Sequence, residues 1–184
     1  MLVVTEREQL PVAEAREGNV EAWESLFRRY RLPLYVYIFE LVRDEQASLD
    51  LVQETFINAF RYLSTLRDDE KVGSWLFSIA HQKCVQHWRR RDRESELQEE
   101  LANTPMTGDE APFDLLIREE QEAEFMKLLA KLPLPQRSAL LLHFVGGFSL
   151  EEIARITDSQ VGTVKSRLHY AKRALRKLLE ENRT

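Results

Sequence analysis

Residues 148–178 constrain the fold more than any other part of the chain, because their pattern encodes two helices separated by a tight turn. Ser149 and Glu152 form an S-x-x-E capping box, in which a hydroxyl and a carboxylate three residues apart satisfy backbone N–H groups at the start of a helix. The Thr-Asp-Ser sequence at 157–159 favours caps and turns over the interior of a helix. A short helix is therefore predicted to end near Ile156, with a second helix following closely.

The second predicted helix combines an apolar stripe with a basic and polar surface. Its apolar residues are spaced four, three, four and three apart, which places them on one buried face: Val164, Leu168, Ala171, Leu175 and Leu178. The other faces carry side chains that donate hydrogen bonds to phosphates and base edges: Thr163, Lys165, Ser166, Arg167, His169, Lys172 and Arg173. This pattern predicts a DNA-binding helix-turn-helix whose second helix enters the major groove by its N-terminal part. An ordinary helical hairpin with a solvated basic face is the alternative interpretation.

The composition of the 184 residues indicates a helical globular protein. Apolar residues make up 43% of the chain and charged residues 31%, while Gly and Pro occur six times each. No apolar run reaches the length that spans a bilayer, and the N-terminus has no signal-like apolar core. One cysteine excludes an internal disulfide framework. These features predict a cytoplasmic protein without membrane insertion.

The net charge of −5 is unevenly distributed along the chain. Residues 1–93 carry 14 basic and 15 acidic side chains, residues 94–124 carry one basic and 11 acidic, and residues 125–184 carry 11 basic and five acidic. The acidity is thus concentrated in the middle, whereas the helix-turn-helix segment is cationic and suited to DNA.

The acidic middle also predicts a boundary between two domains. Residues 94–117 are highly charged, contain prolines and a glycine, and lack a sustained helical stripe. We therefore expect an all-α fold in which two small helical domains, residues 12–93 and 118–180, are joined by an acidic flexible linker. After the linker, helices are expected near residues 118–131 and 136–145, ahead of the helix-turn-helix.

The first domain reads as helices throughout. Asn19 can cap a helix that Pro33 interrupts or restarts, and further helices are predicted at about Glu45 to Leu63 and Ser74 to Arg91. The apolar side of the Glu45–Leu63 helix comprises Leu49, Val52, Phe56, Ala59, Phe60 and Leu63. Its polar face carries Asp50, Gln53, Glu54, Asn58 and Arg61. This division predicts a helix that covers a core with one side only.

His81, Cys84 and His87 are candidate zinc ligands by residue type. Steps of three residues fan across the circumference of a helix, and no fourth ligand is evident nearby in the sequence. A buried cysteine flanked by two polar histidines is the favoured interpretation, so neither a metal nor a cofactor is predicted. The sequence also shows no nucleophile–base pair, phosphate-binding glycine motif or paired-carboxylate site, which argues against an enzyme.

Two blocks of the sequence together resemble a bacterial RNA polymerase sigma factor of the extracytoplasmic-function (ECF) group. The first block comprises DLVQETFINAFRYL and GSWLFSIAHQKCVQHWRRR, and the second runs from LPLPQRSALLLHF through the helix-turn-helix. The resemblance covers about residues 12–93 and 118–180. The pair of motifs is more specific than either half, because the second half also resembles response-regulator output domains.

The resemblance implies a protein that binds core RNA polymerase and directs transcription initiation by sequence-specific promoter recognition. The first domain would contact the clamp coiled coil of the β′ subunit through Asp50, Gln53, Glu54 and Asn58. It would bind the −10 strand through Arg67, Lys71, Ser74, Trp75, Lys83, Arg89 and Arg90. The second domain would contact the β flap and read the −35 duplex through Thr163, Lys165, Ser166, Arg167, His169, Tyr170, Lys172 and Arg173. An anti-sigma partner that wedges against or between the domains is also implied.

The chain departs from the group at the helix-turn-helix turn, where many members have Leu-Gly in place of Thr157-Asp158. Aspartate tolerates left-handed backbone geometry less well than glycine but better than most residues. The position before the second helix is Gln160, where a small capping residue is common, so Ser159 is a candidate cap.

Plainer interpretations stand beside the resemblance. A cationic track with aromatic platforms suits single-stranded DNA, but Trp75 also fits a half-buried core position and the run at 89–91 a solvated helix end. The competing functions are a stand-alone helix-turn-helix transcription regulator and an interaction module that does not bind DNA. A simple regulator usually dimerises on paired half-sites, and no dimerisation heptad is evident.

Overall fold

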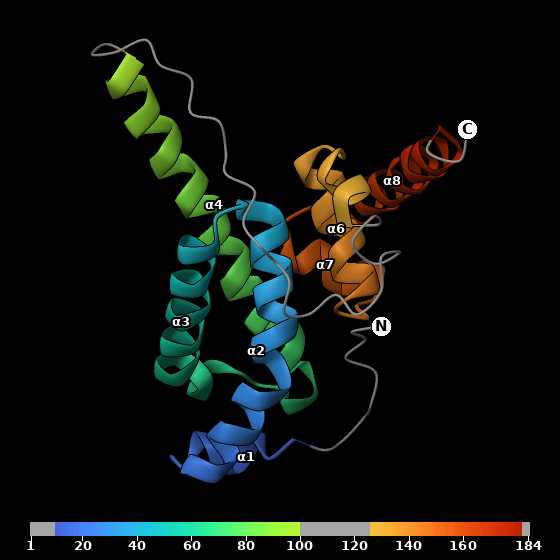
Figure 1. Ribbon diagram of the computed structural model, residues 1–184. Helices are drawn as coiled ribbons and strands as arrows, with labels where there is room; N and C mark the ends of the chain where they lie inside the picture. The colour runs from blue at the N-terminus through green and yellow to red at the C-terminus, as the bar shows by residue number, and fades with distance from the viewer. Residues whose placement is uncertain (1–9, 100–125, 182–184) are drawn as a thin grey trace.

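The computed structural model describes residues 10–99 and 126–181, and every regular element in these ranges is a helix (Figure 1). The expected all-α fold is therefore confirmed. None of the described helices combines the length and apolar character needed to cross a bilayer. The α-helices are α1 (Val12–Arg16), α2 (Val20–Val42), α3 (Glu45–Tyr62), α4 (Val72–Glu99), α6 (Leu134–Phe144), α7 (Leu150–Ile156) and α8 (Val161–Glu181). Short 3-10 helices lie at Leu63–Thr65 and Asp69–Lys71, and residues 126–130 are also helical.

Helix α2 begins as predicted but is not interrupted by proline. The Asn19 side chain accepts a hydrogen bond from the backbone N–H of Ala22 at 3.0 Å, so the predicted cap is confirmed. Pro33 lies inside the helix, which contradicts the expected interruption. A proline removes one backbone hydrogen bond. Here the helix continues because the turn that follows is buried in the core through Leu34 and Tyr37.

Helix α3 buries a face that only partly matches the predicted one: Ala59 and Leu63 are buried, and Val52 and Phe56 pack against the core. The buried side consists of Ser48, Leu51, Thr55 and Ala59. The prediction was wrong for Leu49 and Phe60, which are exposed. The physical reason is that the Ser48 hydroxyl donates to the Asp44 carbonyl at 2.5 Å and the Thr55 hydroxyl to the Leu51 carbonyl at 2.7 Å. Because their hydrogen bonds are made within the chain's own backbone, these polar residues enter the core at little cost.

Helix α4 is longer than predicted. It runs from Val72 to Glu99, so the helix enters the segment 94–117 that was expected to be linker. Residues 94–99 are rich in glutamate and free of glycine and proline, and such residues propagate a helix readily. The predicted linker from residue 100 onward, and most of the helix expected at 118–131, lie outside the described residues.

The helix-turn-helix is formed as predicted. In α7 the Ser149 hydroxyl accepts from the Glu152 N–H at 3.2 Å and the Glu152 carboxylate accepts from the Ser149 N–H at 2.9 Å, which completes the capping box. Asp158 has φ 47°, so the turn places an aspartate in left-handed backbone where glycine is the favoured residue. Helix α6 begins at Leu134, earlier than expected, with Pro135 in its first turn, where proline suits a helix start.

The two helical domains pack against each other (Figure 1). Helix α6 contacts α2, and α7 contacts α4, so the buried residues form one continuous core across both domains. At their junction the rings of Phe77 from α4 and Phe148 from the start of the helix-turn-helix lie 5.0 Å apart in an edge contact. The structure is therefore a closed arrangement in which the helix-turn-helix rests on the first domain.

Candidate nucleic-acid interface and partner surfaces

Helix α8 presents most of its predicted DNA-reading side chains to solvent. Seven are exposed: Thr163, Lys165, Ser166, His169, Tyr170, Lys172 and Arg173. The apolar stripe from Val164 to Leu175 is buried, as predicted, and this burial fixes which side of α8 faces outward. The His169 and Tyr170 rings meet edge-on at 5.5 Å, so they form a small aromatic step on a cationic surface. This surface has the chemistry that base edges and phosphates require.

Arg167 is the exception among the predicted readers, because it is half-buried and turned toward the first domain. Its guanidinium donates to the Ser159 hydroxyl at 2.8 Å, so Ser159 serves as its acceptor. Its charge also acts on His81 of α4. Burial lowers the pKa of His81 first, and the positive charge of Arg167 lowers it further. In the closed arrangement Arg167 is therefore engaged by groups of the protein itself.

The contact between the domains centres on Tyr37 of α2, which is completely buried. Its hydroxyl lies 2.9 Å from the Ser138 hydroxyl of α6 and 2.8 Å from Nδ1 of His81. Burial raises the pKa of Tyr37 far above its ordinary range, so the phenol stays neutral. We call the contact formed by Tyr37, Phe77, Ser138 and Phe148 the interdomain seam. Aromatic packing and hydrogen bonds between neutral groups hold it together.

Charged groups also meet at the junction of α2 and α6. The Glu40 carboxylate is buried and forms an ion pair with Arg43. Burial raises the pKa of Glu40, while Arg43 and Arg137 oppose this shift. Nε of Arg137 is itself buried, with no hydrogen-bond partner among the described residues. Such an unsatisfied donor weakens the closed contact, because water can satisfy it when the contact opens.

The residues predicted to bind the −10 strand lie along the loop before α4 and along α4 itself. Arg67 and Lys71 are exposed, while Ser74 and Trp75 are half-buried. The Lys71 ammonium lies 2.7 Å from the carboxylate of Asp68, and this hydrogen bond lowers the pKa of Asp68. A loop cation is thus neutralised locally in the protein alone.

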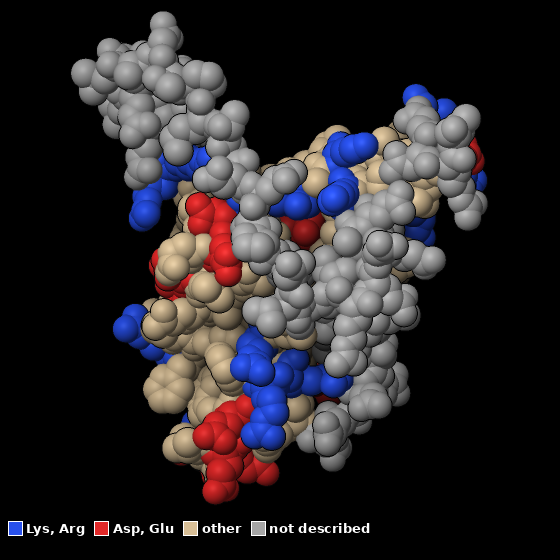
Figure 2. Space-filling view, viewed as in Figure 1, with Lys and Arg blue, Asp and Glu red and all other residues tan. Residues whose placement is uncertain are grey.

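Further along α4, the predicted strand-binding cations differ in their surroundings. Arg89 and Arg90 are exposed. Figure 2 shows basic side chains gathered toward the end of the described part of α4, with acidic side chains below them on the α3 side. Lys83 is instead paired with Glu54 of α3 at 2.8 Å. The structure therefore joins two residues that sequence reasoning assigned to different partners.

The outer face of α3 mixes polar and apolar side chains. Of the predicted polymerase contacts, Asp50, Gln53 and Glu54 are exposed and Asn58 is half-buried. Three apolar residues of the same helix are also exposed: Leu49 to 48%, Ile57 to 42% and Phe60 to 64%. Sequence reasoning missed these three as candidate contacts. The sequence does contain a sign of these exposed residues, because the apolar residues of α3 are spread over more of the helix circumference than a single core can cover.

Aromatic residues of α2 pack against aromatic residues of α3 next to this face. The Trp23 and Phe60 rings lie 5.2 Å apart, and the Phe27 and Phe56 rings lie 4.8 Å apart, so α2 and α3 share an aromatic layer. Phe60 is thereby fixed by a neighbouring ring while most of its own surface remains in solvent. Exposed apolar groups that are held in place mark an interaction surface rather than a loose surface.

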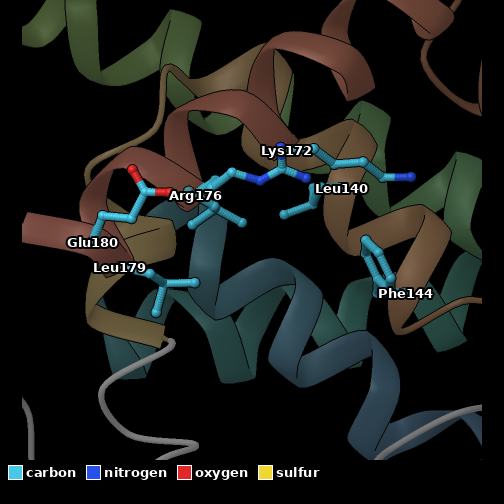
Figure 3. A pocket seen from close by; sticks show the side chains of 7 residues that line it. Leu140, Phe144, Lys172, Arg176, Leu179 and Glu180 are labelled. Atoms are coloured by element: carbon cyan, nitrogen blue, oxygen red, sulfur yellow. The ribbon is translucent and has the colours of Figure 1, made fainter. Parts of the chain in front are cut away.

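A groove of about 520 Å³ is lined by residues of α6 and of the second half of α8, which pack against each other (Figure 3). Its apolar wall is formed by Leu140, Phe144, Leu175 and Leu179. Lys172 and Arg176 line its edge, and the Lys172 ammonium lies 5.7 Å from the centre of the Phe144 ring. Lys172 thus lies between the other predicted DNA-reading residues of α8 and this groove.

The candidate zinc ligands do not converge. His81 is hydrogen-bonded to Tyr37, and Cys84 is buried, which raises the pKa of its thiol to about 12. Across the residues that the structure describes, no three His, Cys, Asp or Glu side chains are grouped as metal ligands. A thiol that stays protonated is a poor nucleophile and a poor ligand, so Cys84 acts as a core residue.

Two family models match the chain, one in each domain. Sigma-70 region 2 matches residues 26–94, and Sigma-70 region 4 matches residues 122–175. The region 2 match excludes a stand-alone helix-turn-helix regulator and a module without DNA-binding function, because neither alternative accounts for the first domain.

Whole-chain comparisons agree with both matches. The RNA polymerase sigma-H factor of Pseudomonas aeruginosa is 32% identical, over 97% of this chain and 97% of that protein. The ECF RNA polymerase sigma factor SigW of Bacillus subtilis is 25% identical, over 92% of this chain and 95% of that protein. The sigma factor RpoE of Bartonella quintana, solved in complex with the anti-sigma factor NepR, has a TM-score of 0.70 at 26% identity. That likeness covers 88% of this chain and 98% of RpoE. The chain therefore belongs to the sigma-70 family of RNA polymerase sigma factors, in its extracytoplasmic-function group.

Proposed function

We propose that this sigma factor binds the β′ clamp coiled coil of core RNA polymerase through the outer face of α3. The observation that carries the proposal is the alternation on this face of hydrogen-bonding groups with exposed, rigidly held apolar groups. Protein interfaces combine a small number of apolar anchors with polar groups that fix the register. Phe60 is the anchor, Leu49 and Ile57 surround it, and Asp50, Gln53 and Glu54 supply the polar contacts.

The −10 strand is assigned to the loop before α4 and to the side of α4 that carries Trp75 and Lys83. Single strands are held by a cationic track and by rings on which bases stack. Lys71, Arg89 and Arg90 provide exposed cations along this route, and Trp75 offers the uncovered part of its ring. In this proposal the polymerase catalyses RNA synthesis and the sigma factor has no catalytic role. The protein acts in the cytoplasm, where the polymerase is found.

The −35 duplex is assigned to the exposed surface of α8, and its recognition requires the seam to open. The two promoter elements lie about 25 base pairs apart, or roughly 85 Å of duplex at 3.4 Å per step. Helix α4, with 28 residues, is itself only about 42 Å long at 1.5 Å per residue. Because α7 packs on α4, the closed molecule cannot contact both elements at once. Opening also separates Arg167 from His81 of the first domain, while its hydrogen bond to Ser159 lies within the second domain.

An anti-sigma partner fits the closed form better on its outside than between its domains. RpoE of Bartonella quintana, which has a similar structure, was solved with an anti-sigma factor. The seam of the present protein is filled by its own side chains, with Phe77 against Phe148 and Tyr37 bonded to Ser138. A partner that covers the outer face of α3 leaves these contacts in place and competes directly with the polymerase.

The groove between α6 and α8 is the proposed contact for the β flap. Its apolar wall accepts one side of an amphipathic helix, and the charges of Lys172, Arg176 and Glu180 can pair with charged residues of that helix. This assignment separates two roles on α8, since the exposed side reads DNA and the groove side binds polymerase.

Reconstituted initiation tests the function as a whole. Purified protein added to core polymerase is expected to start transcription at a discrete site at which neither component initiates alone. Arg167→Ala should then weaken −35 recognition by about 1–3 kcal/mol at one base pair, whereas Lys165→Ala should weaken binding to all sequences and flatten the salt dependence. If both variants read the −35 element as the wild type does, α8 is not the reading helix.

A further inference from the structure

The ion pair between Glu54 and Lys83 links the polymerase surface to the DNA surface. Glu54 belongs to the outer face of α3, and Lys83 belongs to the part of α4 assigned to the promoter strand. The Lys83 ammonium donates to the Glu54 carboxylate at 2.8 Å. The glutamate is 53% exposed, while the lysine is only 20% exposed. The Glu54 side chain therefore remains open to a partner, whereas most of the Lys83 side chain is covered by the protein.

A second carboxylate on the same face makes the contrast clear. Asp50 accepts a hydrogen bond from the Gln46 side chain of its own helix at 3.2 Å. That contact stays within α3 and involves a neutral donor. Glu54 instead reaches across to α4, so any partner that takes the Glu54 carboxylate also changes the charge balance of α4.

The two predicted roles compete for one interaction. A polymerase donor that binds Glu54 draws its negative charge away from Lys83, and Lys83 then carries an unbalanced positive charge in partly covered surroundings. An uncompensated cation in such a place gains by binding an anion. The lysine side chain is a flexible stem with a compact charge, which suits it to a phosphate of the nearby strand.

We propose that the Glu54–Lys83 pair couples polymerase binding to promoter-strand binding. In the free protein Glu54 neutralises Lys83 and weakens strand binding. Core polymerase takes over Glu54 and frees Lys83 to hold the backbone of the strand. Thermodynamic linkage requires the reverse effect as well, so a bound strand strengthens binding of the polymerase to the same degree. The proposal rests on the function assigned above to these two surfaces.

A double-mutant cycle in the free full-length protein tests the first half of the coupling. Affinity for a fluorescent oligo-dT single strand is measured at about 50 mM salt, where a backbone contact contributes strongly. Glu54→Gln is expected to tighten binding about two- to five-fold, the range for a partly exposed ion pair. Glu45→Gln removes the same charge from α3 without touching Lys83, and it serves as the matched control. In a Lys83→Met background, Glu54→Gln should no longer tighten binding.

The same oligonucleotide bound to the assembled holoenzyme tests the second half. Saturating core polymerase has already engaged Glu54, so Glu54→Gln is expected to have no further effect on strand affinity, while Lys83→Met should weaken it. Equal tightening by Glu54→Gln in the free protein and in the holoenzyme overturns the coupling, as does equal tightening by Glu45→Gln or in the Lys83→Met background. A Lys83→Met holoenzyme that binds the strand as tightly as wild type overturns the assignment of Lys83 to the strand itself, which is a different failure.

Discussion

The interdomain seam and the outer face of α3 have similar chemistry and opposite surroundings. Each combines aromatic rings with hydrogen-bonding groups. The seam is covered by the chain itself, since Phe77 is fully buried and meets Phe148 of the other domain. On α3 the comparable ring, Phe60, is supported by Trp23 and is otherwise open. The difference shows that one surface has its partner within the molecule and the other still lacks one.

The sharpest test of this comparison is the stability of two phenylalanine variants. Phe77→Ala should lower the free energy of unfolding by about 3–5 kcal/mol, because it opens a cavity under two aromatic contacts. Phe60→Ala should lower the free energy of unfolding by only about 0.5–1.5 kcal/mol, because it loses the contact with the Trp23 ring while most of its side chain is already exposed. Urea denaturation followed by circular dichroism gives both values. Equal losses would mean that Phe60 is a core residue and that α3 has no free face.

The second test asks whether the open surface is used. Phe60→Ala should weaken binding to core polymerase by about 2 kcal/mol, the scale of an aromatic anchor at an interface. Tyr62→Ala provides the control, because Tyr62 is a comparably exposed aromatic residue in the last turn of the same helix. Fluorescence anisotropy with labelled protein measures both affinities. An equal loss in the two variants would point to a general effect on α3 rather than to an anchor at Phe60.

A smaller change in stability is expected from a change in pH, and it arises at His81, which is hydrogen-bonded to Tyr37 of the interdomain seam. Burial and the charge of Arg167 hold the pKa of His81 below its ordinary value of 6.5 in the closed form. The opened or unfolded chain therefore binds a proton more readily than the closed one, and closed-state stability falls as the pH drops below about 6.5. A single proton limits the slope to about 1.4 kcal/mol per pH unit.

Urea denaturation between pH 7.5 and 5.5 measures this slope, and His81→Gln should flatten it. Glu40 acts in the opposite direction, because its pKa is raised by burial from 4.5 and the folded state favours its proton. The contribution of Glu40 to the free energy of unfolding is fully present below pH 4.5, and it is lost as the pH rises through the pKa of Glu40 in the folded protein. If the His81→Gln protein keeps the wild-type dependence of stability on pH, His81 is not the group that causes it.

The smallest expected effect comes from the hydrogen bonds of the seam. Tyr37→Phe removes the hydroxyl that joins Ser138 to His81, and it should cost about 1 kcal/mol of stability. Energy transfer between dyes placed on the two domains should report a more open population for this variant. Tyr62→Phe, at an exposed site, should leave both measurements unchanged. A Tyr37→Phe protein that is as closed and as stable as wild type would show that the aromatic contact alone holds the seam.

Local patterns were predictable from the sequence where a few neighbouring residues decide the structure. The capping box at Ser149 and the Asn19 cap involve contacts three residues apart, and both are formed. The end of α4 was misplaced because high charge was taken as a sign of a linker, although glutamate is a good helix former. The face of α3 was misplaced because buried Ser48 and Thr55 are polar by type.

Other features have no local signal at all. The hydroxyls of Tyr37 and Ser138 meet across 101 positions of sequence, and the pairing of Lys83 with Glu54 spans 29. The sequence positions of these four residues do not predict which side chains meet, because such contacts depend on how whole helices pack. The predicted site residues were named one by one from a motif, whereas their mutual arrangement required the tertiary structure.

The placement of the tryptophans makes the protein a set of optical probes. The chain has three, and all of them lie in the first domain. Trp23 packs against Phe60 on the surface proposed to bind polymerase, Trp75 lies half-buried at the start of α4, and the indole nitrogen of Trp88 is buried further along that helix. Variants that retain one tryptophan at a time would assign a change in intrinsic fluorescence to polymerase docking, to strand capture or to a change along α4. The second domain contains no tryptophan. Its separation from the first domain would therefore change tryptophan fluorescence only through the surroundings of the tryptophans in the first domain.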